Sequence, residues 1–314
     1  MYTPSSLDAS NFVSSYNTAL YFIGAISITL LIALTFTMLY FVYKYNRKRN
    51  KVATQIEGNT RLEVIWTVIP IMLALGMFHF GWVGWKPMNK APKDAMNITT
   101  IARQWSFTFS YDNGKQSADM VVPVNVPIKA NLVSLDVNHS LFIPQFRVKA
   151  DIIPGRKKFM WFIPQAIGKY QIYCAEYCGL RHSYMGATLT VLSKADFDKW
   201  YATGAAAPTV AGGSPAAAAG LNIMKIQGCF ACHSIDGSRI VGPTYSELYG
   251  SQVVVTEDGK EVTYTADDAY IKHCINDPNS RIVKGFQKGL MQSYKTLLND
   301  DDISKIIEYL KTLK

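Results

Sequence analysis

The sequence predicts a multidomain membrane protein with three parts: a two-helix transmembrane hairpin, an all-β domain and an all-α domain. Three observations predict this class. Two long uncharged stretches lie near the N-terminus, short strand-like runs follow them, and a helical pattern begins after a low-complexity segment. A chain of 314 residues with 49% hydrophobic residues is long enough for two soluble domains and additional apolar segments.

The additional apolar residues form two predicted membrane spans within residues 1–85. Residues 20–43 and 64–85 contain no charged side chain, and their 24 and 22 residues suffice to cross a hydrocarbon core of about 30 Å. A buried helical hairpin of a soluble protein is a weak alternative, because such helices seldom stay uncharged on all sides. A cleaved signal peptide is also weak, since no Lys or Arg precedes the first span.

The charge of the connecting segment predicts the orientation of the hairpin. Residues 44–61 hold six Lys and Arg residues and a single acid, Glu57. The positive-inside rule therefore predicts a cytoplasmic connection in a bacterial inner membrane. Both termini and everything after residue 85 would then lie on the periplasmic or extracytoplasmic side. In that compartment cysteines can be oxidised, metallated or joined to haem.

Residues 86–201 are predicted to form the all-β domain. Aromatic residues alternate in QWSFTFSY, which is typical of a half-buried strand, and later runs rich in Val, Ile and Thr are separated by Pro, Gly and Asn. This pattern favours a small antiparallel sandwich or barrel. The domain holds 15 Lys and Arg against 8 Asp and Glu, a net charge of +7. In an exported domain this favours a partner protein and not nucleic acid.

Residues 202–219 are predicted to be a flexible linker, because the segment ATGAAAPTVAGGSPAAAAG is uncharged and has no apolar periodicity. An Ala-rich helix is the alternative, which two prolines and a Gly pair disfavour. Residues 220–314 are predicted to form the all-α domain. It ends in DDDISKIIEYLKTL, an amphipathic helix with an acidic first turn.

Potential metal ligands are concentrated in the segment CAEYCGLRHSYM. It contains Cys174, Cys178, His182 and Met185, and a second imidazole, His139, lies upstream near the end of a predicted strand. Thiolates, imidazoles and a thioether together select copper over hard cations. Two bridging thiolates, one His on each ion, a Met and a backbone carbonyl would complete a two-copper site. A disulfide and a zinc site are the alternatives, although zinc sites do not usually include Met.

This pattern, a His followed by C-x-E-x-C-x-x-x-H-x-x-M, resembles cytochrome c oxidase subunit II, in which it binds the dinuclear copper A centre. The resemblance implies a cupredoxin-like fold for the all-β domain. It also implies two roles for Glu176. The carbonyl would bind copper, and the carboxylate would bind a magnesium ion shared with the catalytic subunit I.

Two further segments share this resemblance. QWSF is similar to the family's aromatic segment, which implies that Trp105 passes electrons to copper A, although Phe107 stands where the family has a second Trp. LEVIWT resembles the segment whose glutamate opens a proton path into the catalytic subunit. The matching residue is Glu63, at the predicted cytoplasmic membrane surface. An ordinary strand aromatic and a helix-start carboxylate are the alternative interpretations of these two residues.

The segment CFACH has the C-x-x-C-H spacing of covalent c-type haem. Cys229 and Cys232 would form thioethers, and His233 would be an axial ligand of the iron. A thioredoxin-like redox pair is the alternative. It does not require the His, and it occurs beside a βαβ pattern that this region lacks.

The sixth ligand of the haem iron has three candidates, Met224, Met291 and His273. Met224 lies only five residues before Cys229, too close to reach the opposite face of the haem, whereas Met291 follows His233 by 58 residues. GLMQSY resembles the cytochrome c segment around the axial Met, with Gln in place of the usual Pro. These features favour Met291 and imply a class I cytochrome c domain.

Together, the resemblances imply a subunit of a proton-pumping terminal oxidase that passes electrons from haem c to copper A and on to the catalytic subunit, where oxygen is reduced to water. The expected partners are subunit I, other oxidase subunits and the membrane, with a quinol-oxidising complex or a cytochrome c as candidate upstream donors. The alternatives are the equivalent subunit of a copper A nitric oxide reductase and a membrane-tethered electron carrier without a catalytic partner. In the latter, Glu63 and Glu176 would have no evident role.

Overall fold

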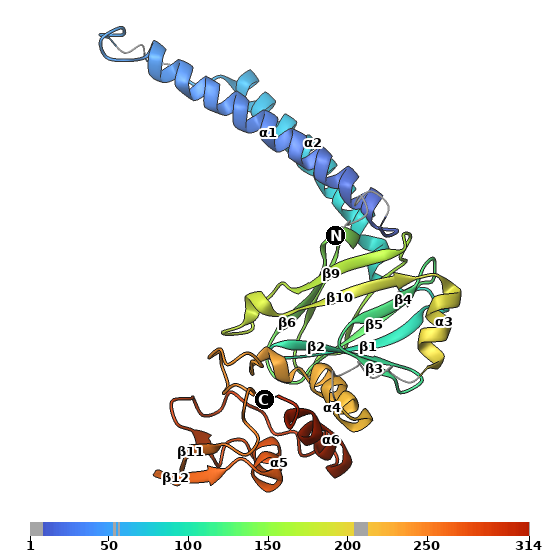
Figure 1. Cartoon of the computed structure of the whole chain (residues 1–314). Coiled ribbons are helices and arrows are strands. Elements are labelled where there is room, and N and C mark those ends of the chain that lie inside the picture. The colour runs from blue at the N-terminus through green and yellow to red at the C-terminus, as the bar shows by residue number, and fades with distance from the viewer. Residues whose placement is uncertain (1–8, 53–54, 56, 204–212, 314) are drawn as a thin grey trace.

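The computed structural model describes residues 9–52, 55, 57–203 and 213–313. A helical hairpin projects from one side of a β domain, and a mainly helical C-terminal domain lies against the opposite side (Figure 1). This order of parts confirms the predicted fold class of a transmembrane hairpin, a β domain and a helical domain.

The hairpin consists of α1 (Val13–Lys44) and α2 (Thr60–Trp85), which continues into the short helix η2 (Lys86–Asn89). Both helices are long and apolar enough to cross a membrane. Each begins before its uncharged stretch, because polar residues can form the first helical turns outside the hydrocarbon core. In α2, the side chain of Asn59 accepts a hydrogen bond from the Leu62 N–H and so caps the helix.

The start of α1 is attached to the β domain. The Ser10 hydroxyl donates to the Phe146 carbonyl at 2.8 Å, and the Asn11 side chain accepts from the Ile163 N–H at 2.7 Å. Phe12 packs edge-on against Trp161, whose indole N–H donates to the Pro87 carbonyl just beyond α2. Both ends of the hairpin that lie near the domain are therefore held by it.

The β domain is a sandwich of two five-stranded sheets. One sheet has the order β3-β2-β1-β5-β8 and the other the order β4-β10-β9-β6-β7. The bounds in the first sheet are β1 (Met96–Arg103), β2 (Ser106–Tyr111), β3 (Gln116–Ser117), β5 (Ile128–Ser134) and β8 (Lys158–Phe162). Those in the second are β4 (Met120–Pro123), β6 (His139–Ile143), β7 (Val148–Ile152), β9 (Gly168–Cys174) and β10 (Gly186–Leu192).

The sequence pattern favoured an antiparallel sandwich or barrel. That prediction is wrong in one respect, because both sheets are mixed. The pairs β1–β5 and β4–β10 are parallel, and the other strand pairs of the two sheets are antiparallel. Three helices complete the domain, η3 (Pro144–Phe146), η4 (His182–Tyr184) and α3 (Lys194–Ala202). The buried faces of both sheets contribute to one hydrophobic core that also contains the two cysteines of the β9–β10 region.

The C-terminal domain contains α4 (Pro215–Ile226), η5 (Cys229–Ala231), α5 (Asp268–Asn276) and α6 (Asp300–Leu310). It also contains a small sheet that the sequence reasoning missed, built from β11 (Gln252–Glu257), β12 (Lys260–Thr265) and β13 (Ile282–Val283). The helices α4 and α6 pack closely at Gly220, where a Cβ atom would collide with the backbone carbonyl of Lys305. The capping box between Asn299 and Asp302 begins α6 at its acidic turn.

The predicted linker is too long at its C-terminal end. Residues 215–219 belong to α4, because the Ser214 hydroxyl accepts a hydrogen bond from the Ala217 N–H and Pro215 occupies the first helical turn. Proline is tolerated there, since the missing N–H would have no partner within the helix. At the other end, Ala202 belongs to α3, and residues 204–212 of the predicted linker lie outside the described residues.

Candidate functional site

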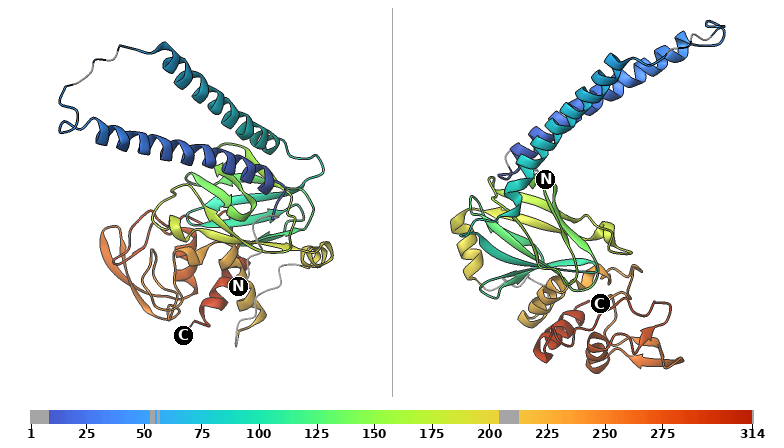
Figure 2. Two further views of the ribbon diagram at one scale, coloured as in Figure 1. Left: turned by 90° about the horizontal axis from the view of Figure 1, so that it is seen from above. Right: turned by 180° about the vertical axis from the view of Figure 1, so that it is seen from behind.

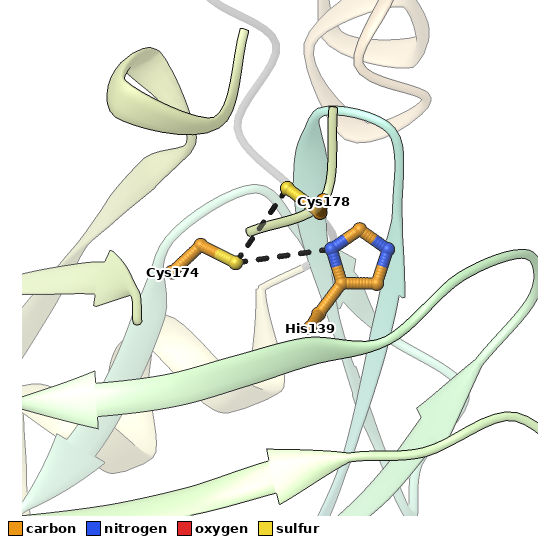
Figure 3. Close-up of side chains that lie close together, drawn as sticks. All are labelled: His139, Cys174 and Cys178. Carbon is orange, nitrogen blue, oxygen red and sulfur yellow. Dashed lines mark hydrogen bonds between the residues drawn. The ribbon is translucent and has the colours of Figure 1, made fainter. Parts of the chain in front are cut away.

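The predicted metal ligands come together at one end of the β sandwich. His139 begins β6, Cys174 ends the neighbouring strand β9, and Cys178, His182 and Met185 lie in the segment that connects β9 to β10. Figure 3 shows the side chains of His139, Cys174 and Cys178 converging. All three are buried, with exposed fractions of 0%, 7% and 3%. Regular strands therefore fix two of the five side chains.

The two cysteine sulfurs lie 3.7 Å apart, and both cysteines are free. The Sγ atom of Cys174 is 3.8 Å from Nδ1 of His139 (Figure 3) and 3.3 Å from the carbonyl oxygen of Glu176. The Sγ atom of Cys178 is 3.6 Å from Nδ1 of His182. Each thiol thus faces one imidazole.

The thioether of Met185 completes this set of donor atoms. Its Sδ atom lies 3.7 Å from Sγ of Cys178, and the residue is 1% exposed. Two sulfurs between two imidazoles, with a thioether on one side and a carbonyl on the other, match a pair of ions bridged by two thiolates. The soft character of these donors suits copper. The residues present therefore fit a dinuclear copper centre.

A carboxylate that the sequence reasoning missed supports one imidazole. Asp136 Oδ1 lies 2.8 Å from Nε2 of His139, so that Nδ1 is the ring nitrogen directed at Cys174. Burial lowers the pKa of His139, but the hydrogen bonds with Asp136 and Cys174 outweigh it and raise the pKa to about 8. The sequence did contain a signal for this contact. Asp136 precedes His139 by only three residues, and a histidine that binds a metal commonly bonds to a carboxylate through its other ring nitrogen.

The two thiols differ in acidity. Burial raises the pKa of Cys174, but hydrogen bonds from His139 and the Ser140 N–H outweigh it and hold the pKa at about 7. Burial and the neighbouring charge of Cys174 raise the pKa of Cys178 to about 12. Because the two thiols are neighbours, a negative charge on one opposes ionisation of the other.

The carboxylate of Glu176 does not belong to the group of side chains around the sulfurs. Its Oε1 atom forms an ion pair with Nζ of Lys149 at 2.7 Å. Among the described residues, His139, Cys174 and Cys178 are the only set of three or more His, Cys, Asp or Glu side chains close enough to hold one ion. Nζ of Lys149 also lies 3.8 Å from Asp151, so the carboxylate of Glu176 is paired with a lysine in this structure.

Trp105 is buried directly beside the ligand segment. Its indole N–H donates to the carbonyl of Cys178 at 3.2 Å, and the Gln104 side-chain amide donates to the same carbonyl at 2.8 Å. Phe107, the other aromatic residue of this segment, lies in the core of β2. Trp105 is thus the aromatic side chain of the segment that contacts the ligand segment.

The C-terminal domain surrounds a cavity of about 700 Å³ that Cys229, Cys232, His233 and Met291 all line. Its volume lies within the range of about 300–1,000 Å³ that is typical of cofactor sites. His233 Nδ1 lies 2.7 Å from the Pro243 carbonyl, which leaves Nε2 free for a metal. The covalent attachment motif, a free imidazole nitrogen and a large cavity together fit a c-type haem.

The structure distinguishes the three candidates for the sixth iron ligand. Met291 lines the cavity, whereas Met224 is fully buried in the core of the domain. Nε2 of His273 instead forms a hydrogen bond with the Ser280 hydroxyl, at 2.7 Å. Of the three, only Met291 lines the cavity.

Glu63 lies far from both sites. It belongs to the first turn of α2, at the end of the hairpin that is remote from the β domain (Figure 1). The structure therefore brings the predicted copper ligands together, groups the predicted haem residues around one cavity, and leaves Glu63 apart.

The two sites lie next to each other across the boundary of the two domains. Arg103 and Gln104 of the β domain also line the cavity of the C-terminal domain. Ala231 and Cys232 pack against the hydrophobic cluster that contains Trp105 and the two cysteines of the metal site. Sequence reasoning missed this boundary, because no local pattern indicates which surfaces of two domains meet.

Comparison with known proteins gives matches for all three parts. Residues 3–81 match the family described as cytochrome c oxidase subunit II, transmembrane domain, and residues 114–192 match its periplasmic domain. Residues 217–314 match the family described as cytochrome c. The matched domains imply copper A in the β domain and haem c in the C-terminal domain.

Two relatives are similar to this chain over most of its length. Cytochrome c oxidase subunit 2 of Bacillus sp. (strain PS3) is 30% identical over 293 residues, which cover 85% of this chain and 78% of the relative. The same subunit of Alkalihalophilus pseudofirmus is 28% identical over 284 residues, with coverages of 86% and 79%. A crystal structure of the periplasmic domain of subunit II of cytochrome oxidase from Bradyrhizobium japonicum is 32% identical. The match covers 35% of this chain and 94% of the chain in that structure, with a TM-score of 0.34. The chain belongs to the cytochrome c oxidase subunit II family and carries a C-terminal cytochrome c domain.

Proposed function

We propose that this chain accepts electrons for a proton-pumping terminal oxidase, at haem c, and delivers them through copper A to the catalytic subunit that reduces oxygen to water. The observation that carries the proposal is the position of the haem cavity directly beside the copper ligand segment. When bound, haem c and copper A would each take up and release one electron at a time. The protein residues hold, space and insulate these groups.

The copper site would use the donors that converge on the two sulfurs. Cys174 and Cys178 would bridge the ions, and the remaining ligands would be His139, His182, Met185 and the carbonyl of Glu176. The strands β6 and β9 are paired, so they resist changes in ligand spacing. A rigid ligand set suits electron transfer, because little rearrangement accompanies the change in charge.

The haem site would use Cys229 and Cys232 for thioether attachment and His233 and Met291 as axial ligands. Gly242 allows the close approach of the His233 ring, since a Cβ atom would lie 2.6 Å from its Cε1 atom. The hydrogen bond to Pro243 orients the ring with Nε2 toward the cavity. A Met ligand would raise the reduction potential.

Trp105 would be the side chain through which electrons reach copper A. Its support is the 3.2 Å hydrogen bond from the indole nitrogen to the carbonyl of Cys178. The indole is 4% exposed and belongs to the hydrophobic cluster against which Ala231 and Cys232 of the C-terminal domain pack. Electrons would then leave the haem domain and enter the copper domain without crossing bulk water.

Two carboxylates would serve the catalytic subunit. Glu63 would open a proton path at the cytoplasmic end of α2, which agrees with its distance from the metal sites. Glu176 would bind magnesium at the boundary with subunit I. The ammonium group of Lys149 now contacts that carboxylate and would have to move away.

The soluble domains would lie on the periplasmic side of the inner membrane. The segment between the spans is strongly basic, which favours a cytoplasmic position for it. Residues 10–12 at the start of α1 contact the β domain, so the N-terminal end of the hairpin shares the side of that domain. The catalytic subunit and the other oxidase subunits would be its partners in the membrane, with a quinol-oxidising complex or a cytochrome c upstream.

The complex purified from membranes would test the proposal. We expect two copper ions and one haem c on this chain, haem signals from a catalytic subunit, and cyanide-sensitive oxygen uptake with a chemical reductant. Copper and haem c without oxygen uptake would contradict an oxidase. Nitric oxide consumption by the same preparation would indicate a nitric oxide reductase, and the absence of any catalytic partner would indicate a tethered carrier.

A further inference from the structure

A buried arginine of the copper domain lines the haem cavity. Arg103, the last residue of β1, is 6% exposed, and its Nε atom has no hydrogen-bond partner. None of the ion pairs found within the described part of the chain involves it. Burying a cation without a carboxylate is unfavourable, so this side chain calls for an explanation.

The partners of Arg103 lie mainly in the haem domain. Its Nη2 atom donates to Oε1 of Gln227 at 2.7 Å, and its guanidinium lies 5.4 Å from the ring centre of Tyr294. The Tyr294 hydroxyl in turn donates to the Gln227 carbonyl at 3.1 Å. One arginine of the copper domain thus joins two residues that lie far apart in the sequence of the haem domain.

The backbones of the two domains also approach closely beside this contact. The Thr108 hydroxyl donates to the carbonyl of Ile226 at 2.7 Å and lies 3.4 Å from Nη2 of Arg103. Gly228, just before the first haem-attachment cysteine, has a φ of +71°, and a Cβ atom there would collide with the hydroxyl of Ser106. These contacts surround Arg103 with a closely fitted boundary.

The residue after Arg103 connects this boundary to the copper site. Gln104 lines the haem cavity, and its side-chain amide donates to the carbonyl of Cys178 at 2.8 Å. Its backbone N–H donates to Asp136 at 2.7 Å, and Asp136 also accepts from Gln292, the neighbour of Met291, at 3.3 Å. Fixing the end of β1 therefore fixes both the wall of the cavity and the ligand segment.

We propose that Arg103 is a positioning residue for electron transfer, because it locks the haem domain onto the copper domain in one orientation. The proposal rests on the function proposed above. The buried charge of Arg103 at the cavity wall also favours the reduced haem, since reduction lowers the positive charge on the iron. The residue would therefore influence both the distance between the sites and the reduction potential of haem c.

The test uses the intact oxidase complex with Arg103→Met, which removes the charge and the hydrogen bonds at similar length. The matched control is Arg156→Met, at an exposed turn of the same domain. After rapid photoreduction of haem c, the rate of its oxidation by copper A is recorded. Losing a hydrogen bond from a charged group should lower the population of the transfer-competent orientation, so we expect a rate about ten- to a hundredfold lower in R103M and an unchanged rate in the control.

A potentiometric titration gives a second reading that a purely structural role would not move. The midpoint potential of haem c should fall in R103M and stay near the wild-type value in Arg103→Lys, which keeps the charge. Wild-type transfer in R103M would overturn the positioning role. An unchanged potential would overturn the placement of the charge at the cavity wall.

The single variant Gln227→Leu keeps the test valid if R103M folds poorly, because it should also slow the transfer, and a double-mutant cycle with R103M tests whether the contact is direct. Gln227→Leu removes the acceptor from the haem-domain side, and its effect on the transfer rate should be smaller when Arg103 is already Met than in the wild type. Fully additive effects would contradict a direct contact. A wild-type complex without transfer from haem c to copper A would instead refute the proposed function itself, so the two failures are distinguishable.

Discussion

The copper site and the haem site solve the same task, holding a redox group, with opposite architectures. At the copper site, every donor atom lies within 3.8 Å of a cysteine sulfur, and paired strands provide two of the ligands. At the haem site, the four predicted attachment and axial residues line a cavity of about 700 Å³. The copper domain therefore has a complete protein core, whereas the haem domain has a core that a cofactor must complete.

Removal of the haem-attachment cysteines should give the largest effect in this comparison. In Cys229→Ala/Cys232→Ala we expect complete loss of covalent haem c and a marked fall in the thermal stability of the C-terminal domain, because the cavity is left without its apolar content. Haem-stained denaturing gels and calorimetry measure the two effects. A domain with unchanged stability would contradict the idea that the cofactor completes its core.

Removal of one copper ligand should leave the β domain folded. We expect Cys178→Ser to lose the dinuclear centre, since the bridge between the ions is broken, while the sandwich keeps its melting temperature within a few degrees of metal-free wild type. Metal analysis and circular dichroism provide the measurements. Collapse of the sandwich in this variant would show that copper, like haem, is part of the core.

The carboxylate behind His139 should have an intermediate effect. Asp136→Asn keeps the shape but weakens the hydrogen bond that orients the imidazole. We expect copper affinity to fall about 10- to 100-fold, as for other residues that support metal ligands. Competition with a chelator measures the affinity, and Asp112→Asn, on an exposed turn of the same domain, is the matched control.

The smallest expected effect concerns the start of the haem domain. Ser214→Ala removes the hydroxyl that caps α4, and we expect the free energy of unfolding of the C-terminal domain to fall by about 1 kcal/mol. Denaturant titration of the haem absorbance would measure it. Retention of the full stability would mean that packing against α6, and not the cap, determines where α4 begins.

The ligand patterns were readable from the sequence because their members are close together in the chain. Cys174, Cys178, His182 and Met185 occupy a single short segment, and CFACH is a continuous motif. The apolar spans and the alternating strands also have local signatures. These features fixed the domain order and the candidate ligands, and the fold class is confirmed.

Other features depended on long-range contacts or on signals that were overlooked. The contact of Arg103 with Gln227 joins residues 124 positions apart, and no local pattern predicts it. The β11–β12 hairpin did carry a signal, since Asp258 and Gly259 adopt positive φ angles at a turn between alternating strands, and Asp-Gly favours such turns. The start of α4 was missed because the Ala-rich composition masked its Ser-Pro cap.

The attachment of the hairpin at two points has a mechanical consequence for the whole subunit. The start of α1 is held through Ser10 and Asn11, and the end of α2 through the bond from Trp161 to Pro87. A domain suspended from one helix could swivel about it, but one suspended from two cannot turn without bending a helix. The two attachments therefore hold the copper site at a fixed height and tilt relative to the membrane-spanning hairpin.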